Sequence, residues 1–194
     1  WLDRLARPRV ALIGHSEGGL SVAHAAQGEP RVSALVLLAA PGRRLAEIAR
    51  AQFRANPYLA PVLDAALAAT DALERGERVD PATLPAELRV TFPAQAQPFL
   101  IDMMRRDPAR ALAATRVPVL IVQGGRDLQV TSEDADRLAA ARPDAERADF
   151  SAMTHVLKDC DSDERLPNLL TYASPDLPLT PGLADRVAAF LRRV

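Results

Sequence analysis

The chain has 194 residues, of which 48% are hydrophobic, 25% charged and 4% aromatic. This composition and length fit one ordinary globular domain, and they exclude a disordered or collagen-like chain. The net charge of -1 offers no attraction to phosphate backbones or anionic lipids, so we expect no nucleic-acid or membrane partner. A single cysteine, Cys160, excludes an internal disulfide framework, and with only three histidines we expect neither a metal nor a cofactor.

The start of the chain lacks an initiator Met, and residues 1–6 have the pattern of the last turns of an amphipathic helix. There is no signal peptide and no uninterrupted apolar span of about 20 residues. We expect residues upstream of this sequence, where a secretion signal stays open. The composition itself fits a reducing, cytoplasmic compartment.

Short apolar runs alternate with helical patterns along the chain, which predicts a parallel α/β sheet with helices on both faces. The four expected strands span residues 10–13, 32–40, 117–123 and 145–150. The expected helices that follow the strands span residues 20–26, residues 131–142 and residues 180–194. Thr131 or Ser132 is a typical cap for the second of these helices, and Pro181 suits the first turn of the third.

Residues 43–116 differ from the strand-rich segments 1–42 and 117–194, because helical periodicity dominates there and several prolines break its middle. This pattern predicts a helical cap inserted into an α/β core. The insertion carries six large apolar residues of interest, namely Phe53, Tyr58, Phe99, Leu100, Met103 and Met104. They line an acyl pocket or hold the helices of the insertion together, and packing is the commoner role for any one of them.

A G-x-S-x-G motif, GHSEG at residues 14–18, stands between the first expected strand and the first expected helix. This context is typical of a nucleophile elbow, a strained turn that presents Ser16 at the carboxyl end of a sheet. Gly14 and Gly18 fit because side chains two residues from a strained serine would clash. The backbone amide of Glu17 is expected at the N-terminus of the helix, where it can donate to an oxyanion.

A nucleophilic serine needs a histidine base and a carboxylate that orients it. Of the three histidines, His15 lies beside the serine and is expected to point elsewhere, and His24 is best explained by packing. His155 follows the fourth expected strand, and Asp127 directly follows the third. Because the carboxyl ends of parallel strands share one edge of the sheet, we expect both side chains on the same rim as Ser16.

These residues make the chain resemble the α/β-hydrolase superfamily, especially bacterial serine-aminopeptidase-like and dienelactone-hydrolase-like esterases. The similar segments are GHSEGG at 14–19, PVLIVQGGRDLQV at 118–130, MTHVLK at 153–158 and YASPDLPL at 172–179. The resemblance implies that Ser16 is the nucleophile, Asp127 the orienting acid and His155 the general base. It also implies that the Glu17 amide is one oxyanion donor and that the insertion occupies the position of the family's lid.

The chain departs from that family in its number of strands, since four are expected here and the family has about eight. We therefore expect the C-terminal portion of a larger hydrolase, with the second oxyanion donor upstream. The expected activity is hydrolysis of a small-molecule carboxylic ester. Two alternatives stay open: an aminopeptidase or another acyl transferase on the same triad, and an inactive relative that serves as a binding protein.

Overall fold

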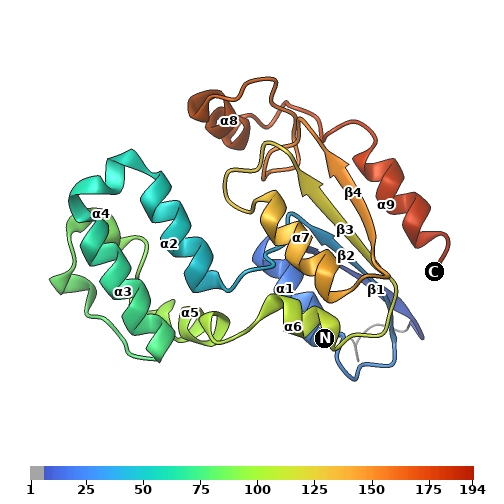
Figure 1. Cartoon of the computed structure of the whole chain (residues 1–194), viewed down its shortest axis with the longest axis horizontal. Helices are drawn as coiled ribbons and strands as arrows, with labels where there is room; N and C mark the ends of the chain where they lie inside the picture. Colours follow the sequence, from blue (N-terminus) through green and yellow to red (C-terminus); the bar gives the residue numbers. More distant parts are fainter. Residues whose placement is uncertain (1–6) are drawn as a thin grey trace. The chain divides into compact units, whose positions relative to one another are not determined.

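Four parallel strands form one sheet in the computed structural model, which describes residues 7–194 (Figure 1). The helical turns expected at residues 1–6 lie outside the described residues. The strands are β1 (Val10–His15), β2 (Val32–Leu38), β3 (Val119–Gly124) and β4 (Glu146–Phe150), and they lie side by side in this order. The predicted parallel sheet is confirmed, and the observed strand ends differ from the expected ones by at most two residues.

The described residues fall into two compact units, one that ends at Gly42 and resumes at Pro108, and one from Arg43 to Asp107. In the first unit, helices cover both faces of the sheet. These are α1 (Glu17–Ala25), α6 (Pro108–Ala113) and α7 (Ser132–Ala141) on one face and α9 (Leu183–Leu191) on the other. The sequence favours this arrangement, because the two central strands β2 and β3 are largely apolar on both faces, as expected for the buried strands of a parallel sheet.

The side chains of β2 and β3 alternate between the two faces. Ala34, Val36 and Leu120 form a buried cluster with Phe190 of α9. Leu37 points to the opposite face, where the nearest helices approach the sheet closely. The two central strands are therefore fixed by packing from both sides, whereas the edge strands β1 and β4 are partly exposed.

The second unit is helical and has its own core. Its elements are α2 (Leu45–Ala55), η2 (Pro57–Val62), α3 (Leu63–Arg75), η3 (Pro81–Thr83), α4 (Ala86–Arg89) and α5 (Gln97–Met104). Its buried core consists of Ala46, Ala66, Ala69, Leu73, Leu88, Phe92 and Met104. Gln97, only 1% exposed, holds the proline-broken middle of the unit by bonding to both backbone groups of Val79.

The boundary of the insertion differs from the prediction, since the helical unit ends at Asp107 and not at Arg116. The reason is α6, which belongs to the α/β unit. Its Leu112 is fully buried, and the Ala111 carbonyl accepts a 3.0 Å hydrogen bond from the Gln27 side chain. Helical periodicity alone does not distinguish a helix of the insertion from a helix that covers the sheet.

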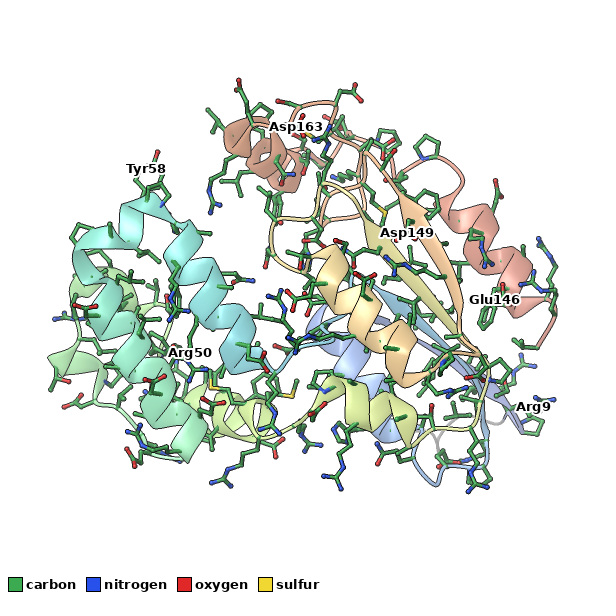
Figure 2. The ribbon with its side chains drawn as sticks, viewed as in Figure 1. Arg9, Arg50, Tyr58, Glu146, Asp149 and Asp163 are labelled. Carbon is green, nitrogen blue, oxygen red and sulfur yellow. The ribbon has the colours of Figure 1, made fainter. Side chains whose placement is uncertain are left out.

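The six residues considered for an acyl pocket have different environments within the helical unit. Met103 and Met104 are buried, and Phe53 and Leu100 pack against the core of the unit. Tyr58 is 85% exposed and projects into solvent (Figure 2), and Phe99 is about half exposed. Packing accounts for the first four, so the acyl-pocket interpretation has no support from their placement.

A long segment connects β4 to the last helix. It contains α8 (Arg165–Leu170) and η4 (Thr171–Ala173) before α9 begins. The last helix starts at Leu183, three residues after Thr180, because Gly182 adopts a left-handed conformation with φ of 80°. The expected start at Thr180 or Pro181 is therefore wrong, and Pro181 lies in the turn that precedes the helix.

Candidate active site

Ser16 occupies a sharp turn between β1 and α1. Its φ of 54° and ψ of -131° lie far from the helical and extended regions, and its backbone amide donates to the Leu38 carbonyl at 2.9 Å. A non-glycine residue in such a conformation is strained and persists only where the surroundings hold it. The elbow expected from the sequence is thus present as a strained turn fixed to the neighbouring strand.

The two glycines of the motif differ in what they provide. A Cβ built on Gly14 would come within 2.4 Å of the Gly18 carbonyl oxygen, a contact that no side chain tolerates. A Cβ on Gly18 meets no heavy atom within 4 Å in the part of the chain that the structure describes. The expected steric need therefore applies to Gly14, and for Gly18 the described residues impose none.

Asp127 follows β3 on a tight loop, and two backbone amides fix its carboxylate. Its Oδ1 accepts hydrogen bonds from the amides of Gln129 at 2.8 Å and Val130 at 2.9 Å. The side chain is fully buried. A buried carboxylate needs partners for both oxygens, and the remaining Oδ2 is directed at the ring of His155.

His155 lies on the loop after β4, where its ring connects the other two residues. Its Nδ1 is 2.8 Å from Asp127 Oδ2, and its Nε2 is 3.0 Å from Ser16 Oγ. Because a carboxylate only accepts hydrogen bonds, Nδ1 carries the proton and Nε2 presents its lone pair to the serine hydroxyl. The structure thus brings Ser16, His155 and Asp127 together in the order that proton transfer requires.

The loops that carry the acid and the histidine interlock through their backbones. The amide of Gly125 donates to the Phe150 carbonyl at 2.8 Å, and the amide of Arg126 donates to the Met153 carbonyl at 3.0 Å. A Cβ on Gly124 would lie 2.2 Å from the Met153 oxygen. The two glycines before Asp127 therefore permit the close approach that places the carboxylate beside the imidazole.

Glu17 is the first residue of α1, so its amide lies at the positive end of the helix dipole. An amide in this position, next to the serine, is suited to stabilise an oxyanion. The structure supports this placement of the Glu17 backbone as the sequence predicted it.

The sequence interpretation missed the contribution of His15. It was expected to point away from the serine, and its Nε2 lies instead 2.7 Å from the backbone carbonyl of His155, with the two rings 4.9 Å apart. The sequence reasoning considered His15 only as a possible base and did not consider a bond to the backbone of His155. A histidine that directly precedes the nucleophile was the available signal.

A second group that the sequence did not indicate comes from α8 and η4. The Asn168 side chain, 2% exposed, donates to the Arg126 carbonyl at 2.6 Å, and Gln129 donates to the Tyr172 hydroxyl at 2.8 Å. Burial raises the pKa of Tyr172 above its ordinary value, and the negative charge of Asp127 acts in the same direction. These contacts support the acid loop from outside, and they depend on tertiary packing that no local pattern reveals.

The described residues also bear on metals and membranes. Among residues 7–194, no group of three or more His, Cys, Asp or Glu side chains is arranged to hold a metal ion. Within the same residues, no helix has the length and apolar character needed to span a bilayer.

Comparison with known proteins identifies similar sequences and folds. Residues 1–190 match the model of the alpha/beta hydrolase family. The esterase EstD of Thermotoga maritima is 30% identical over 130 residues, which are 66% of this chain and 29% of the esterase. The chain therefore spans less than a third of the length of that curated relative.

Solved structures share the fold at lower sequence identity. A bromoperoxidase from Bacillus anthracis matches with a TM-score of 0.55 and 19% identity over 98% of this chain and 70% of its own. An enol-lactonase from Burkholderia xenovorans matches with a TM-score of 0.52 and 20% identity over 98% of this chain and 68% of its own. At this level of identity the similarity establishes the fold and does not extend to the reaction.

Proposed function

The chain belongs to the alpha/beta hydrolase family, and we propose that it is a serine hydrolase that cleaves carboxylic esters. The observation that carries the proposal is the continuous hydrogen-bonded line from Ser16 through His155 to Asp127, with distances of 3.0 and 2.8 Å. The 30% identity to an esterase supports the substrate class.

In the first half of the proposed reaction, Ser16 Oγ attacks the ester carbonyl carbon. Nε2 of His155 takes the hydroxyl proton as the new C–O bond forms, and the carbonyl oxygen becomes an oxyanion. The imidazolium returns its proton to the leaving alkoxide as the ester bond breaks. An alcohol leaves, and the acyl group stays on the serine.

In the second half, water takes the place of the alcohol. His155 removes a proton from water, the hydroxide attacks the acyl carbon, and the proton passes to Ser16 Oγ as the acyl group departs as a carboxylic acid. The buried carboxylate of Asp127 keeps the imidazole in the required tautomer and stabilises its cationic form. The Glu17 amide stabilises the oxyanion in both halves, and loss of such a donor typically costs about 10²–10³ in rate.

The strain at Ser16 supports the proposal independently of the line of hydrogen bonds. Its φ of 54° holds Oγ at the carboxyl end of the sheet without the help of a flexible loop. A surface serine with no catalytic role has no need of a conformation that costs on the order of 1–3 kcal/mol.

The test is covalent capture by a fluorophosphonate together with turnover of nitrophenyl esters of increasing chain length, on the full-length protein. Ser16→Ala is expected to abolish both labelling and turnover and to leave the thermal unfolding midpoint unchanged. Aminoacyl anilides, run in parallel, distinguish an aminopeptidase. Labelling that survives in Ser16→Ala would mean that another serine is the nucleophile, and inactivity of the wild type on every substrate would contradict the proposal.

A further inference from the structure

We infer that His15 is a positioning residue, which sets the distance between the serine and the catalytic imidazole through the backbone of His155. This inference rests on the proposed function, since it assigns a role within that same site. It differs from the triad roles because the hydrogen bond of His15 goes to the backbone of His155 and not to a group that transfers the proton.

His15 is anchored in the sheet. It is the last residue of β1, where it pairs in register with Leu38 of β2. Its backbone is therefore part of the sheet, and Ser16 follows it directly. A hydrogen bond from the His15 ring therefore fixes the position of its partner relative to the same strand that carries the nucleophile.

His155 is held by contacts on its acid side and along its own loop. On the acid side, its ring bonds to Asp127, whose carboxylate is itself fixed by two amides. Before and after it in the chain, Thr154 bonds to Lys158 through both its amide and its hydroxyl, and Leu157 is held at φ of 62°. None of these contacts fixes the position of His155 relative to β1.

The hydrogen bond between His15 and the His155 carbonyl has a defined direction. The carbonyl oxygen of His155 only accepts hydrogen bonds, so Nε2 of His15, at 2.7 Å, is the donor. No other backbone amide or side chain within residues 7–194 forms a recorded hydrogen bond to this carbonyl. The His15 bond is therefore the link between the histidine loop and the elbow apart from the catalytic Ser16–His155 contact.

The hydrogen bonds also determine which ring nitrogen of each histidine carries a proton. His15 must carry its proton on Nε2, and His155 must carry its proton on Nδ1 to donate to Asp127. The two neighbouring imidazoles thus donate through different ring nitrogens. If His15 lost its Nε2 proton to Nδ1, two acceptors would face each other at 2.7 Å, and the histidine loop would move away from the serine.

The test uses variants that place a donor at different reach. In His15→Gln, the side-chain nitrogen can occupy the position of the imidazole Nε2, and in His15→Asn the amide is one methylene too short. His15→Phe keeps a ring and loses the donor. We expect kcat for ester turnover to fall about tenfold in His15→Asn and His15→Phe, with KM within about twofold of wild type, and to stay within about threefold in His15→Gln.

The readouts separate positioning from general stability. A purely structural role would lower the unfolding midpoint of all three variants and would not spare the Gln variant. Equal loss in His15→Gln and His15→Asn, unchanged kcat in His15→Phe, or a rise in KM at constant kcat would each overturn the inference.

A second measurement uses only the wild-type protein, so it does not depend on whether the variants fold. Imidazole nitrogen shifts from heteronuclear NMR of the wild-type protein at neutral pH should show His15 protonated on Nε2 and His155 protonated on Nδ1. A His15 ring protonated on Nδ1 alone would exclude the bond. If the wild type hydrolysed no ester, the proposed function would fail, while these nitrogen shifts would still decide whether the His15 bond exists.

Discussion

The two ends of the sheet in the α/β unit both bury polar side chains, yet they use them differently. At the amino end, Arg142, 7% exposed, donates to the carbonyls of Thr115 and Val117, each at 3.0 Å, to the Thr115 hydroxyl and to the Asp144 carboxylate. At the carboxyl end, His155 is equally buried, but its Nε2 faces a half-buried hydroxyl. One cluster is fully occupied by structural bonds, and the other keeps one bond that chemistry can use.

Backbone strain is also distributed unevenly between the two ends of the sheet. Among the described residues, three that are not glycine have a positive φ: Ser16 after β1, Ala39 after β2 and Leu157 in the loop after β4. All three follow the carboxyl ends of strands, and the amino end has none within residues 7–194. Strain persists where the packing around it is sufficient, so this sheet carries its conformational cost at the end that holds Ser16, His155 and Asp127.

The largest expected effect comes from the orienting carboxylate. Asp127→Asn keeps an oxygen for the amides of Gln129 and Val130 but presents NH₂ to the imidazole, which favours the wrong tautomer of His155. We expect kcat to fall by about 10³–10⁴ while the free energy of unfolding changes by less than about 1 kcal/mol. Steady-state kinetics and urea unfolding measure the two quantities. If activity were retained, Asp127 would have no role in catalysis and the contrast between the two ends would lose its chemical meaning.

The next effect tests strain at the elbow with two matched glycines. In Gly14→Ala, the new Cβ would lie 2.4 Å from the Gly18 carbonyl, so the elbow must shift, and we expect a loss of about 3 kcal/mol or more together with reduced turnover. Gly18→Ala adds a Cβ where the described residues leave open space, and Gly18 lies within α1.

We expect Gly18→Ala to change the free energy of unfolding by less than about 1 kcal/mol, because alanine is favoured over glycine in a helix. Chemical denaturation of both variants makes the comparison. Equal destabilisation by the two substitutions would contradict the steric difference between the two glycines.

Much of the α/β unit could be predicted because its signals are local. Buried strands read as apolar runs, and the glycine-flanked serine between a strand and a helix predicted the elbow. Asp127 and His155 could be named because each follows a strand, and parallel strands end at one edge. These two predictions needed only the chain order and the geometry of parallel sheets.

The remainder was set by tertiary contacts that leave no local pattern. The end of the helical unit was misplaced because α6 has the same periodicity as the helices before it. His15 was set aside because nothing in the sequence shows that the loop of His155 returns to it. Asn168 approaches the acid loop from 42 positions away, a distance over which spacing carries no information.

At the amino end, Arg142→Met should change stability and leave catalysis intact. Methionine keeps much of the buried volume but leaves the carbonyls of Thr115 and Val117 without their donor, at a cost of about 2–4 kcal/mol. The control is Arg137→Met on the same helix, which removes an exposed pair with Glu133 and should cost less than about 0.5 kcal/mol. Urea unfolding and ester turnover at a temperature where both variants are folded give the answer, and a lower kcat in Arg142→Met would show that the two ends are coupled.

The smallest expected effect concerns acid stability, through the exposed partner of that arginine. The hydrogen bond from Arg142 lowers the pKa of Asp144 from 3.8 to about 2. Because the folded value lies below the unfolded one, this carboxylate stabilises the protein fully above about pH 4, and its contribution is lost as the pH falls toward 2. Asp144→Asn should therefore be slightly less stable than wild type at pH 7, and the difference should vanish near pH 2.

Asp176→Asn is the control, since Asp176 is exposed and has no recorded ion pair among residues 7–194. Urea unfolding from pH 2 to 7 should show a gap between wild type and Asp144→Asn that grows with pH, and Asp176→Asn shows how much of any gap comes from the loss of one negative charge alone. A gap that is the same at every pH would mean that the Asp144 side chain contributes through its shape and not through its charge. The Arg142 cluster would then depend on its backbone partners alone, which would make the amino end still more distinct from the charge-dependent site at the other end of the sheet.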